Sequence, residues 1–376
     1  MELIFWLCFG LVAYVYIGYP LLAWVLARLV GRDVLRTPIE PSVTVIIAAH
    51  NEIGHIAATV TNKLEQDYPR DKLDVIVVSD ASTDGTDEAA VALGPRVRVL
   101  RQEPQAGKTA ALNMAVRHAD GEILVFSDAN SLYARDAVHQ LVQNFSDESV
   151  GYVTGHMVYT SSDGSLIGDG CSTYMRYENF IREQESRLAS VVGVDGGIDA
   201  IRREHFRPLS PDQQSDFVLP MMVAGDGLRV VYERYALLKE AALEDQESEY
   251  HMRVRVALRA MWALWDQRRL LNPLSRPLLA WQIWSHKVLR YAAFIPILLG
   301  FGACAVLATA SDLYALLLIA GLIFAGSGIW VWRRGGNGNR LLLVPYYLLL
   351  LNLSAGHAFC KLLAGERRAV WVPRAG

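Results

Sequence analysis

Short apolar runs and longer amphipathic stretches alternate along the chain from Val43 to Phe145. We predict buried strands for the runs Val43–Ala49, Asp74–Ser79, Arg96–Leu100 and Glu122–Ser127. We predict helices for the stretches between and after them, Gly54–Gln66, Asp84–Leu93, Lys108–His118 and Ala134–Asn144. Strands joined by helices usually pair in parallel, so this pattern predicts an α/β domain with a mainly parallel sheet.

The polar sequence after this alternation is less regular. It predicts a strand pair over 151–160, short strands over 198–202 and 229–232, and helices over 173–188, 216–224 and 244–265. At 376 residues the chain has room for one large domain plus accessory segments.

Four segments carry no charged residue over about 20 residues, the length that crosses a bilayer as a helix. They are 3–27, 291–311, 313–332 and 341–360. The first is too long for the apolar part of a cleaved signal and has no basic region before it, so we interpret it as a retained anchor. Arg28, Arg32 and Arg36 follow it, and the positive-inside rule therefore places Thr37 onward in the cytoplasm.

These segments predict four parts of the chain. They are an N-terminal transmembrane anchor at 1–36, a cytoplasmic domain at 37–270, an interfacial amphipathic segment at 271–290 and a C-terminal transmembrane region at 291–376. The interfacial assignment rests on Leu and Trp residues mixed with Arg276, His286 and Lys287. We expect one N-terminal and about three C-terminal transmembrane helices in a multi-pass protein of the inner cell membrane.

Three C-terminal spans conflict with the positive-inside rule at the carboxyl terminus. Three spans after a cytoplasmic domain would leave Lys361, Arg367 and Arg374 outside, against the positive-inside rule. Three interpretations stay open: the last segment is re-entrant, one apolar run is not a span, or the tail is an exception.

Charge and cysteine content exclude several classes of function. The net charge of −3 is small, and no Lys/Arg cluster with interleaved aromatic residues occurs in the polar region, so we predict no nucleic-acid binding. The four cysteines show no Cys-x-x-Cys spacing of the kind used for zinc or redox chemistry.

Carboxylates close two of the predicted strands. Asp80 ends the second strand and Asp128 ends the fourth. Side chains at the carboxyl ends of parallel strands converge on one crevice, which is where open α/β sheets bind ligands. Asn130 lies two residues after Asp128 and points the same way on an extended chain. Oxygen ligands of this kind suit Mg²⁺ or Mn²⁺ shared with a diphosphate, although an Asx turn is an alternative.

Other polar residues follow the predicted strands at the same edge. Asn51 and Glu52 come directly after the first strand and could accept hydrogen bonds from a nucleobase or ribose. Lys108 follows Gly107 at a helix start, where backbone amides and the helix dipole favour anions, so it is a candidate diphosphate ligand. A solvated helix-start lysine is the alternative for Lys108, and helix capping is the alternative for Asp84.

The ordered set of these motifs resembles a known family. His50-Asn-Glu52, Val75–Thr86, Gly107–Asn113 and Phe126–Asn130 look like the signature of the family 2 glycosyltransferases. The similarity is greatest to the membrane-embedded, cellulose-synthase-like branch, continues through Gly193–Arg203 and Ser285-His-Lys287, and covers about residues 1–300. The resemblance implies a GT-A type fold.

The resemblance also implies roles for the donor-side residues. Asn51 and Glu52 lie where the family cradles the nucleoside, and Asp80 lies where it contacts the base. Lys108 would bind the diphosphate, and Asp128 would be the first acid of the Asp-x-Asp metal motif. Here Asn130 takes the second position, where an amide oxygen is a weaker ligand than a carboxylate.

The same resemblance implies three catalytic residues. Asp216 falls where the family places its general base, although Gln214 and Ser215 depart from the usual Thr-Glu. A carboxylate there can take the proton of the attacking acceptor hydroxyl. Helix N-capping is the alternative for Asp216.

Arg255, with Arg253 beside it, resembles the arginine of a Gln-x-x-Arg-Trp element that balances the leaving diphosphate. Met252 and Val256 replace the Gln and Trp of that element, which counts against synthesis of long polymers.

The expected function is an inverting transfer of a sugar from a nucleotide sugar, with a UDP-sugar as the favoured donor, at the cytoplasmic membrane surface. The expected acceptor is a lipid-linked or growing glycan in polysaccharide biosynthesis, and membrane lipids are expected partners. Two alternatives stay open: a processive polysaccharide synthase, and a degenerate glycan-binding subunit without activity. The sequence leaves the donor sugar, the acceptor and the linkage undefined.

Overall fold

The computed structural model describes residues 1–160, 169–241, 246–335 and 339–367. The chain forms two compact units. The helical unit comprises Met1–Leu29, Ile167–Gln184 and Ala242–Glu366, and the α/β unit comprises Val30–Leu166, Glu185–Ala241 and Arg367–Gly376. The long helix α7 (Asp169–Leu188) begins in the first and ends in the second.

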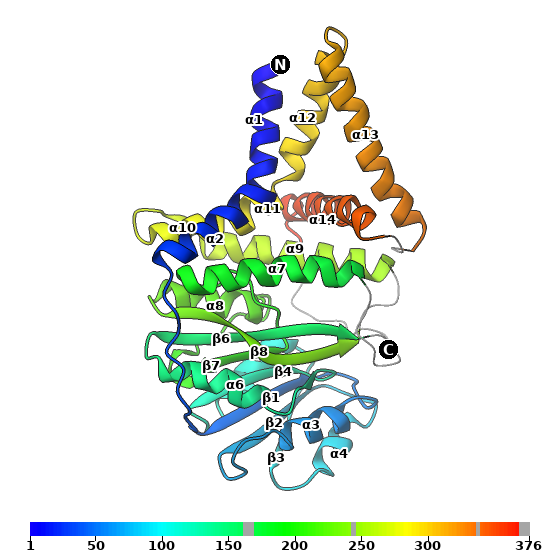
Figure 1. Cartoon of the computed structure of the whole chain (residues 1–376). Coiled ribbons are helices and arrows are strands. Elements are labelled where there is room, and N and C mark those ends of the chain that lie inside the picture. The colour runs from blue at the N-terminus through cyan, green and yellow to red at the C-terminus, as the bar shows by residue number, and fades with distance from the viewer. Residues whose placement is uncertain (161–168, 242–245, 336–338, 368–376) are drawn as a thin grey trace. The chain divides into compact units, whose positions relative to one another are not determined.

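One sheet organises the α/β unit. Among the described residues its strands lie in the order β3-β2-β1-β4-β7-β6-β8-β5 (Figure 1). Their bounds are β1 Val43–Ala49, β2 Leu73–Asp80, β3 Val97–Gln102, β4 Ile123–Asp128, β5 Leu132–Tyr133, β6 Val150–Thr160, β7 Ile198–Arg202 and β8 Arg229–Ala241. The first four are parallel to one another, β7 runs antiparallel to both β4 and β6, and β8 runs parallel to β6. The predicted mainly parallel α/β sheet is therefore confirmed.

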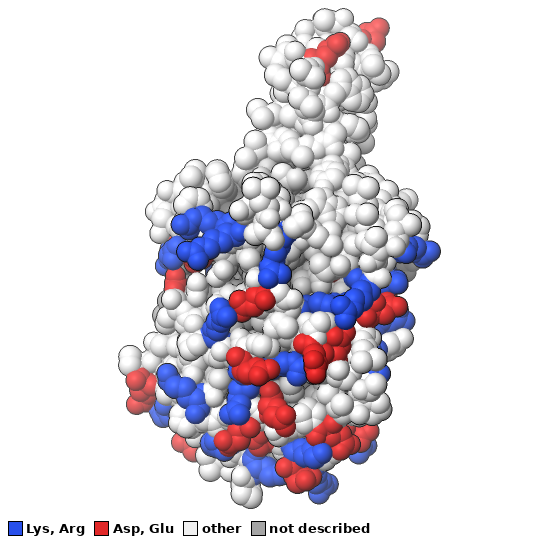
Figure 2. Space-filling view, turned by 90° about the vertical axis from the view of Figure 1, so that its left-hand side faces the viewer, with Lys and Arg blue, Asp and Glu red and all other residues white. Residues whose placement is uncertain are grey.

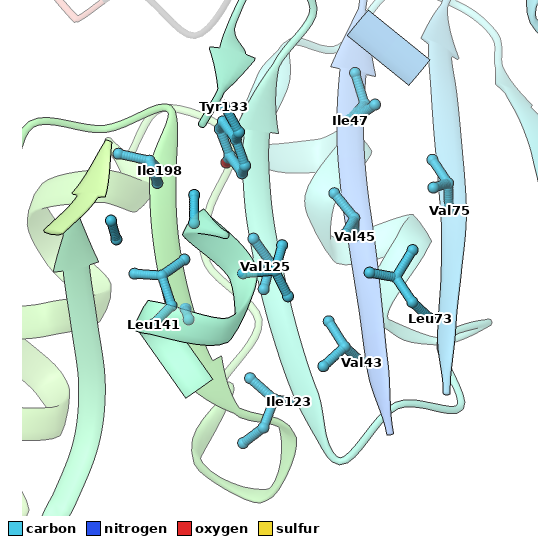
Figure 3. Packing of buried hydrophobic residues seen from close by; sticks show 14 of the residues in the cluster. Val43, Val45, Ile47, Leu73, Val75, Ile123, Val125, Tyr133, Leu141 and Ile198 are labelled. Atoms are coloured by element: carbon cyan, nitrogen blue, oxygen red, sulfur yellow. The ribbon is translucent and has the colours of Figure 1, made fainter. Parts of the chain in front are cut away.

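Apolar residues on both faces of the central strands are buried. Val43, Val45 and Ile47 of β1 point to one face together with Leu73, Val75 and Val125 of the neighbouring strands (Figure 3). Ile46, Ile76 and Leu124, which alternate with them, are fully buried on the other face. Strands buried on both faces read as continuous apolar runs, which is why the sequence revealed them.

Helices and short turns connect these strands. They are α3 Ile56–Leu64, α4 Thr86–Val91, α5 Lys108–Val116, α6 Ala137–Gln143, α8 Ser215–Gly225 and the 3-10 turns Asn144–Ser146 and Arg203–His205. Buried residues of α3, α4 and α6 join the core cluster on the first face of the sheet. Each of the helices predicted between strands is present, with ends within a few residues of the prediction.

Two predictions for the later strands were wrong. Residues 151–160 form one continuous strand, β6, rather than a pair, and β8 has 13 residues instead of four. Beside a register shift in β6 lies Gly155, where a Cβ would lie 2.6 Å from the carbonyl oxygen of Ala236. Gly155 thus allows β6 to pack closely against β8, and the chain does not turn back at this glycine as a strand pair would require.

The helical unit contains the apolar segments. Its elements are α1 Glu2–Ala13, α2 Tyr19–Val30, α9 Gln246–Asp266, α10 Pro277–Ile283, α11 Leu289–Tyr291, α12 Phe294–Leu307, α13 Asp312–Arg333 and α14 Arg340–Leu363, with a 3-10 turn at Arg268–Leu271 and π-helical turns at Tyr14–Gly18 and Trp284–Val288. By length and composition, three helices of the described part can cross a membrane: Glu2–Val30, Asp312–Arg333 and Leu341–Leu363. A fourth candidate, Pro277–Tyr291 with Phe294–Leu307, is bent by 58°.

The first of these helices packs against the beginning of α13. The rings of Phe5 and Tyr314 lie 5.4 Å apart, and the indole of Trp6 donates to the hydroxyl of Tyr314 over 3.2 Å. The amino terminus and the turn between α12 and α13 therefore lie at the same end of this unit (Figure 1). In the space-filling view acidic side chains lie at the tip of this end and the surface below the tip is uncharged, whereas the α/β unit carries many charged side chains (Figure 2).

The last helix, α14, runs across α12 and α13 rather than along them (Figure 1). In its most apolar stretch 44% of the residues are buried, against 11% in that of α13. Polar residues of α14 find partners within the unit: Asn352 donates to the hydroxyl of Tyr16 over 2.8 Å, and His357 lies 3.0 Å from the hydroxyl of Tyr250. The side chains of α14 thus combine an apolar surface with a polar, buried face.

Candidate active site

Lys108 and Asp128 meet at the carboxyl edge of the parallel strands. Lys108 is the first residue of α5 and follows Gly107, whose φ of 90° suits only glycine well. Its amine donates to Oδ1 of Asp128 over 2.5 Å. Burial opposes the charged amine, but the carboxylates of Asp128 and Asp216 raise the pKa of Lys108. Lys108 is therefore charged at the position where the sequence predicted a residue that binds the diphosphate.

Asp80 holds the loop that leads into Lys108. Its carboxylate is buried and accepts hydrogen bonds from the Gln102 side chain at 2.5 Å, the Ala106 amide at 2.8 Å and the Gly107 amide at 2.9 Å. A carboxylate with three donors is engaged on most of its acceptor sites. In the structure Asp80 thus binds the backbone of the loop before Lys108. The base contact that the resemblance implies would be a second role.

The loops after β1 and β2 are bound to each other. Asn51 has a φ of 55°. Its backbone amide donates to the hydroxyl of Ser82, and its side-chain oxygen accepts from the backbone amide of Thr83 at 2.9 Å. The amide of Glu52 donates to the hydroxyl of Thr86 at 2.9 Å. Burial raises the pKa of the Glu52 carboxyl, and a hydrogen bond from His55 opposes that shift. The predicted nucleoside residues are therefore fixed in one bonded pair of loops.

Asp84 also joins these loops. It accepts from the Ile53 amide at 3.0 Å and from both the amide and the hydroxyl of Thr86, the first residue of α4. The N-cap of α4 is Gly85, so the capping interpretation of Asp84 is wrong in position, although the carboxylate accepts from the amide of the first helical residue.

Two consecutive glycines separate Asp128 from Asp216. Gly196 and Gly197 have φ values of 71° and 74°. A Cβ on Gly196 would lie 2.6 Å from Oδ2 of Asp216, and a Cβ on Gly197 would lie 3.3 Å from Oδ2 of Asp128. A side chain at Gly196 would collide with Asp216 and one at Gly197 would crowd Asp128, so residues from β4, the 193–197 loop and α8 form one small site.

Asp216 lies in the first turn of α8 and is not its N-cap. The N-cap is Gln214, and no side chain caps this helix. The capping interpretation of Asp216 is therefore wrong, because the helix begins one residue earlier than predicted.

The metal prediction is consistent with a site that the substrate completes. Within the described residues, no three His, Cys, Asp or Glu side chains are grouped so as to hold a metal ion. Asp128 and the partly buried Asn130 supply one carboxylate and one amide. Mg²⁺ and Mn²⁺ are commonly held by one or two side-chain oxygens plus substrate phosphates, and this donor set fits that arrangement.

Asp199 is a buried carboxyl that the sequence left without a role. It lies in β7 between Phe126 of β4 and Thr154 of β6. Burial, reinforced by the charge of Asp216, raises the pKa of Asp199 to about 8. Sequence offered no signal for this burial, because Asp199 occupies a short strand whose neighbours come from distant parts of the chain.

We expect Asp199→Asn to stabilise the fold increasingly as the pH rises. The unfolded carboxyl ionises near pH 4, but the folded one stays protonated up to about pH 8. Wild type therefore loses stability between these values, by at most about 1.4 kcal/mol per pH unit, and the amide variant does not. Thermal unfolding in detergent at pH 5, 6.5 and 8 measures this difference.

The matched control is Asp71→Asn, at an exposed position. A constant difference between Asp199→Asn and wild type across the three pH values would contradict the buried, protonated carboxyl.

Arg253 and Arg255 belong to α9 of the helical unit. The guanidinium of Arg253 pairs with Glu249 at 2.7 Å and lies 4.9 Å from the ring centre of Tyr174 and 5.7 Å from that of Tyr347. Arg255 is partly buried on the same helix. The α/β unit brings Lys108, Asp128 and Asp216 together, and a shared site with the two arginines stays a prediction.

Comparison with known proteins places this geometry in a family. A model of glycosyl transferase family 2 matches residues 44–209. An N-acetylglucosaminyltransferase from Bradyrhizobium elkanii is 32% identical over 132 residues, which are 34% of this chain and 72% of that protein. The chain belongs to glycosyl transferase family 2. The resemblance to this family is confirmed, and membership of its cellulose-synthase-like branch stays a prediction.

A solved structure extends the similarity over almost the whole chain. A mannosyltransferase from Pyrobaculum calidifontis, in complex with GDP-Man and Mn²⁺, has a TM-score of 0.75 and 26% identity, and the match covers 96% of this chain and 99% of that one. The GT-A type fold is thus confirmed.

Other family relatives match over only part of their length. A β-monoglucosyldiacylglycerol synthase from Nostoc is 28% identical over 169 residues, which are 44% of this chain and 36% of that protein. The chain thus covers about a third of the length of that relative.

Proposed function

We propose that this family 2 enzyme is a membrane-bound, inverting glycosyltransferase that moves a sugar from a nucleotide sugar to a lipid-linked or growing glycan acceptor. The observation that carries the proposal is the arrangement of Lys108, Asp128 and Asp216 around Gly196 and Gly197. A cation and a carboxylate with a neighbouring amide suit a metal-bound diphosphate, and a second carboxylate suits deprotonation of an acceptor.

The donor half of the proposed site lies at the ends of β1, β2 and β4. Asn51, Glu52 and Asp80 would hold the nucleoside, and Lys108 would bind the diphosphate. Asp128 and Asn130 would hold Mg²⁺ or Mn²⁺, which supplies charge neutralisation to the diphosphate when bound. The Pyrobaculum neighbour contains GDP-Man and Mn²⁺, which supports this class of ligand and adds a GDP-sugar to the UDP-sugar that we favoured from sequence.

The acceptor half of the proposed site is centred on Asp216. Its carboxylate would take the proton of the acceptor hydroxyl as the hydroxyl attacks the anomeric carbon, and a direct displacement of this kind inverts the configuration. Arg253 and Arg255 would balance the charge of the leaving diphosphate. The Nostoc relative is named as a glucosyldiacylglycerol synthase, which supports a lipid acceptor.

We propose that the helix Glu2–Val30, the bent pair Pro277–Tyr291 with Phe294–Leu307, and α13 cross the membrane, and that α14 lies along its cytoplasmic surface. This arrangement leaves the amino terminus and the α12–α13 turn outside, consistent with the contact between Phe5 and Tyr314. It also places Arg28, Arg333 and Lys361 on the cytoplasmic side, as the positive-inside rule requires. The interpretation that one apolar run is not a span is therefore favoured, and the sequence beyond Arg367 lies outside the described residues.

The proposed function is tested with inside-out membrane vesicles that carry the protein. Nucleotide sugars cannot cross the bilayer, so transfer without detergent requires the site to face the cytoplasm. A panel of UDP- and GDP-sugars is added with Mn²⁺, and lipid and polymer products are identified by mass spectrometry. One added sugar on a lipid is the expected product, and a long polymer would favour the processive alternative. Absence of transfer with every donor would contradict the proposal.

We expect Gly196→Ala to reduce transfer by at least about tenfold, because the new Cβ meets Oδ2 of Asp216 at 2.6 Å and must displace it. The matched control is Gly94→Ala. Gly94 has a φ of 103°, and no neighbouring atom lies within 4 Å of the point that a Cβ would occupy, so this variant carries comparable backbone strain without the contact. Turnover and thermal unfolding are measured for both. Equal turnover in the two variants would show that Gly196 does not keep space for Asp216.

A further inference from the structure

One face of α3 binds the backbone of the loop that contains the candidate metal ligands. The hydroxyl of Thr59 donates to the carbonyl oxygen of Ala129 over 2.7 Å, and the amine of Lys63 donates to that of Ser131 over 2.6 Å. Asn62 makes two bonds to Tyr133: it accepts from the amide at 2.8 Å and donates to the carbonyl at 3.0 Å. Four hydrogen bonds thus follow the loop from Ala129 to Tyr133.

The helix periodicity explains why these side chains act together. Positions i, i+3 and i+4 lie on one face of a helix, and Thr59, Asn62 and Lys63 have this spacing. The same helix turns Ile56 and Val60 into the core of the α/β unit. Thus α3 presents an apolar face to the sheet and a polar row to the loop.

Lys63 is the unusual member of this row because it is fully buried. Burying an amine is costly unless hydrogen bonds compensate. Here the amine bonds to the Ser131 carbonyl and to Oδ1 of Asn62 at 3.0 Å, and it lies 3.6 Å from the ring centre of Tyr133. A buried leucine would avoid the cost of desolvating an amine. What lysine adds is a hydrogen-bond donor directed at the loop.

Tyr133 extends the contact to the other side of the site. Its hydroxyl lies 2.7 Å from the carbonyl oxygen of Gly197 and 3.0 Å from that of Phe126. Gly197 is the residue packed against Oδ2 of Asp128. In Figure 3, Tyr133 points to the same side of the sheet as Val125 and Ile198. The row on α3 is therefore connected through Tyr133 to β4, which ends in Asp128, and to the 193–197 loop.

We propose that Thr59, Asn62 and Lys63 are positioning residues that hold the 128–133 backbone so that Asp128 and Asn130 meet a metal-bound diphosphate in one geometry. The inference rests on the proposed function for the ligand and goes beyond it in assigning a role to α3. Ligand residues need their supporting shell to stay within about 0.5 Å of the productive geometry. An amide ligand at Asn130 makes that support more important, because it attracts the metal less than a carboxylate would.

The test compares Lys63→Met and Thr59→Val with wild type, Asp128→Ala and two matched controls. Lys72→Met changes a lysine of the same unit that is 41% exposed, and Thr61→Val makes the same threonine change on the same helix. Mn²⁺ is titrated into the full-length protein in detergent with GDP, and in a second series with UDP, and free Mn²⁺ is followed by electron paramagnetic resonance. Hydrogen exchange of the 129–133 amides is measured in the metal-free protein.

We expect Lys63→Met to weaken Mn²⁺ binding about tenfold, the lower range for loss of an outer-shell partner, and Thr59→Val to weaken it less. Amide exchange at Ser131 and Tyr133 should become faster in Lys63→Met. The two controls should match wild type in both measurements. A residue that merely supported the fold would lower the unfolding temperature without changing the Mn²⁺ titration.

Two results separate failure of this inference from failure of the proposed function. If Asp128→Ala binds Mn²⁺ as wild type does, the metal assignment itself is wrong. If Asp128→Ala loses binding while Lys63→Met and Thr59→Val keep wild-type affinity and exchange, the role of α3 is overturned. Should Lys63→Met fail to fold, Thr59→Val decides the question alone, because it removes one bond and keeps the side-chain volume.

Discussion

Replacing Asp216 by asparagine is expected to lower the turnover number about a thousandfold while donor binding stays nearly unchanged. General-base catalysis contributes roughly 10²–10⁴-fold, and an amide of the same size cannot take the acceptor proton. Asparagine fits the space beside Gly196 that Asp216 occupies, so the substitution should remove the base without moving its neighbours. Turnover is measured with the donor found in the vesicle panel, and donor affinity by calorimetry.

The control for this prediction is Asp226→Asn at the other end of α8. Asp226 pairs with Arg207 at 2.7 Å and is 38% exposed. It should retain wild-type turnover. If Asp216→Asn retained more than about a tenth of wild-type turnover, a different group would have to be the base.

Replacing Asp128 by alanine is expected to abolish the effect of Mn²⁺ on nucleotide binding and to reduce transfer by at least about a thousandfold. The change removes the carboxylate that Asn130 cannot replace and also removes the partner of Lys108 at 2.5 Å. Lys108 keeps Asp216 as a nearby charge, so it should remain a cation able to bind phosphate. Calorimetry of GDP and UDP binding with and without Mn²⁺ separates the contribution of the metal from that of Lys108.

Asp120→Ala serves as the control for Asp128→Ala. Asp120 precedes the same strand, pairs with Arg98 at 3.1 Å and is 83% exposed. A response to Mn²⁺ in Asp128→Ala equal to that of Asp120→Ala would exclude Asp128 as a metal ligand. The two aspartate variants should therefore differ in metal response, whereas Asp216→Asn should respond to Mn²⁺ as wild type does.

Local sequence patterns predicted the parallel half of the fold well. β1 was predicted with its observed bounds, and β2, β3 and β4 within two residues at each end. These strands are buried on both faces and separated by helices, so each one stands out from its neighbours in hydropathy. The strand-end positions of Asp80 and Asp128 and the helix-start position of Lys108 followed from that pattern.

Prediction was weaker where pairing joins distant segments. β6 and β8 pair along most of their length, although about 70 residues separate them in sequence. Their polar residues, such as His156 and Tyr232, face each other across the pair at 2.9 Å. Because nothing local indicates this pairing, residues 151–160 were assigned to two strands.

The amino-acid sequence by itself determined the α/β class, the apolar helices and the order of the motifs that identify a family 2 glycosyltransferase. These features depend on residue type and spacing within about 20 residues, so neighbouring residues encode them. Only the tertiary structure decided which carboxylates share a site, how Gly196 and Gly197 separate them, and that Lys63 is buried under the 128–133 loop. Such contacts join segments that are far apart in the chain, and their geometry is set by the packing of the whole unit.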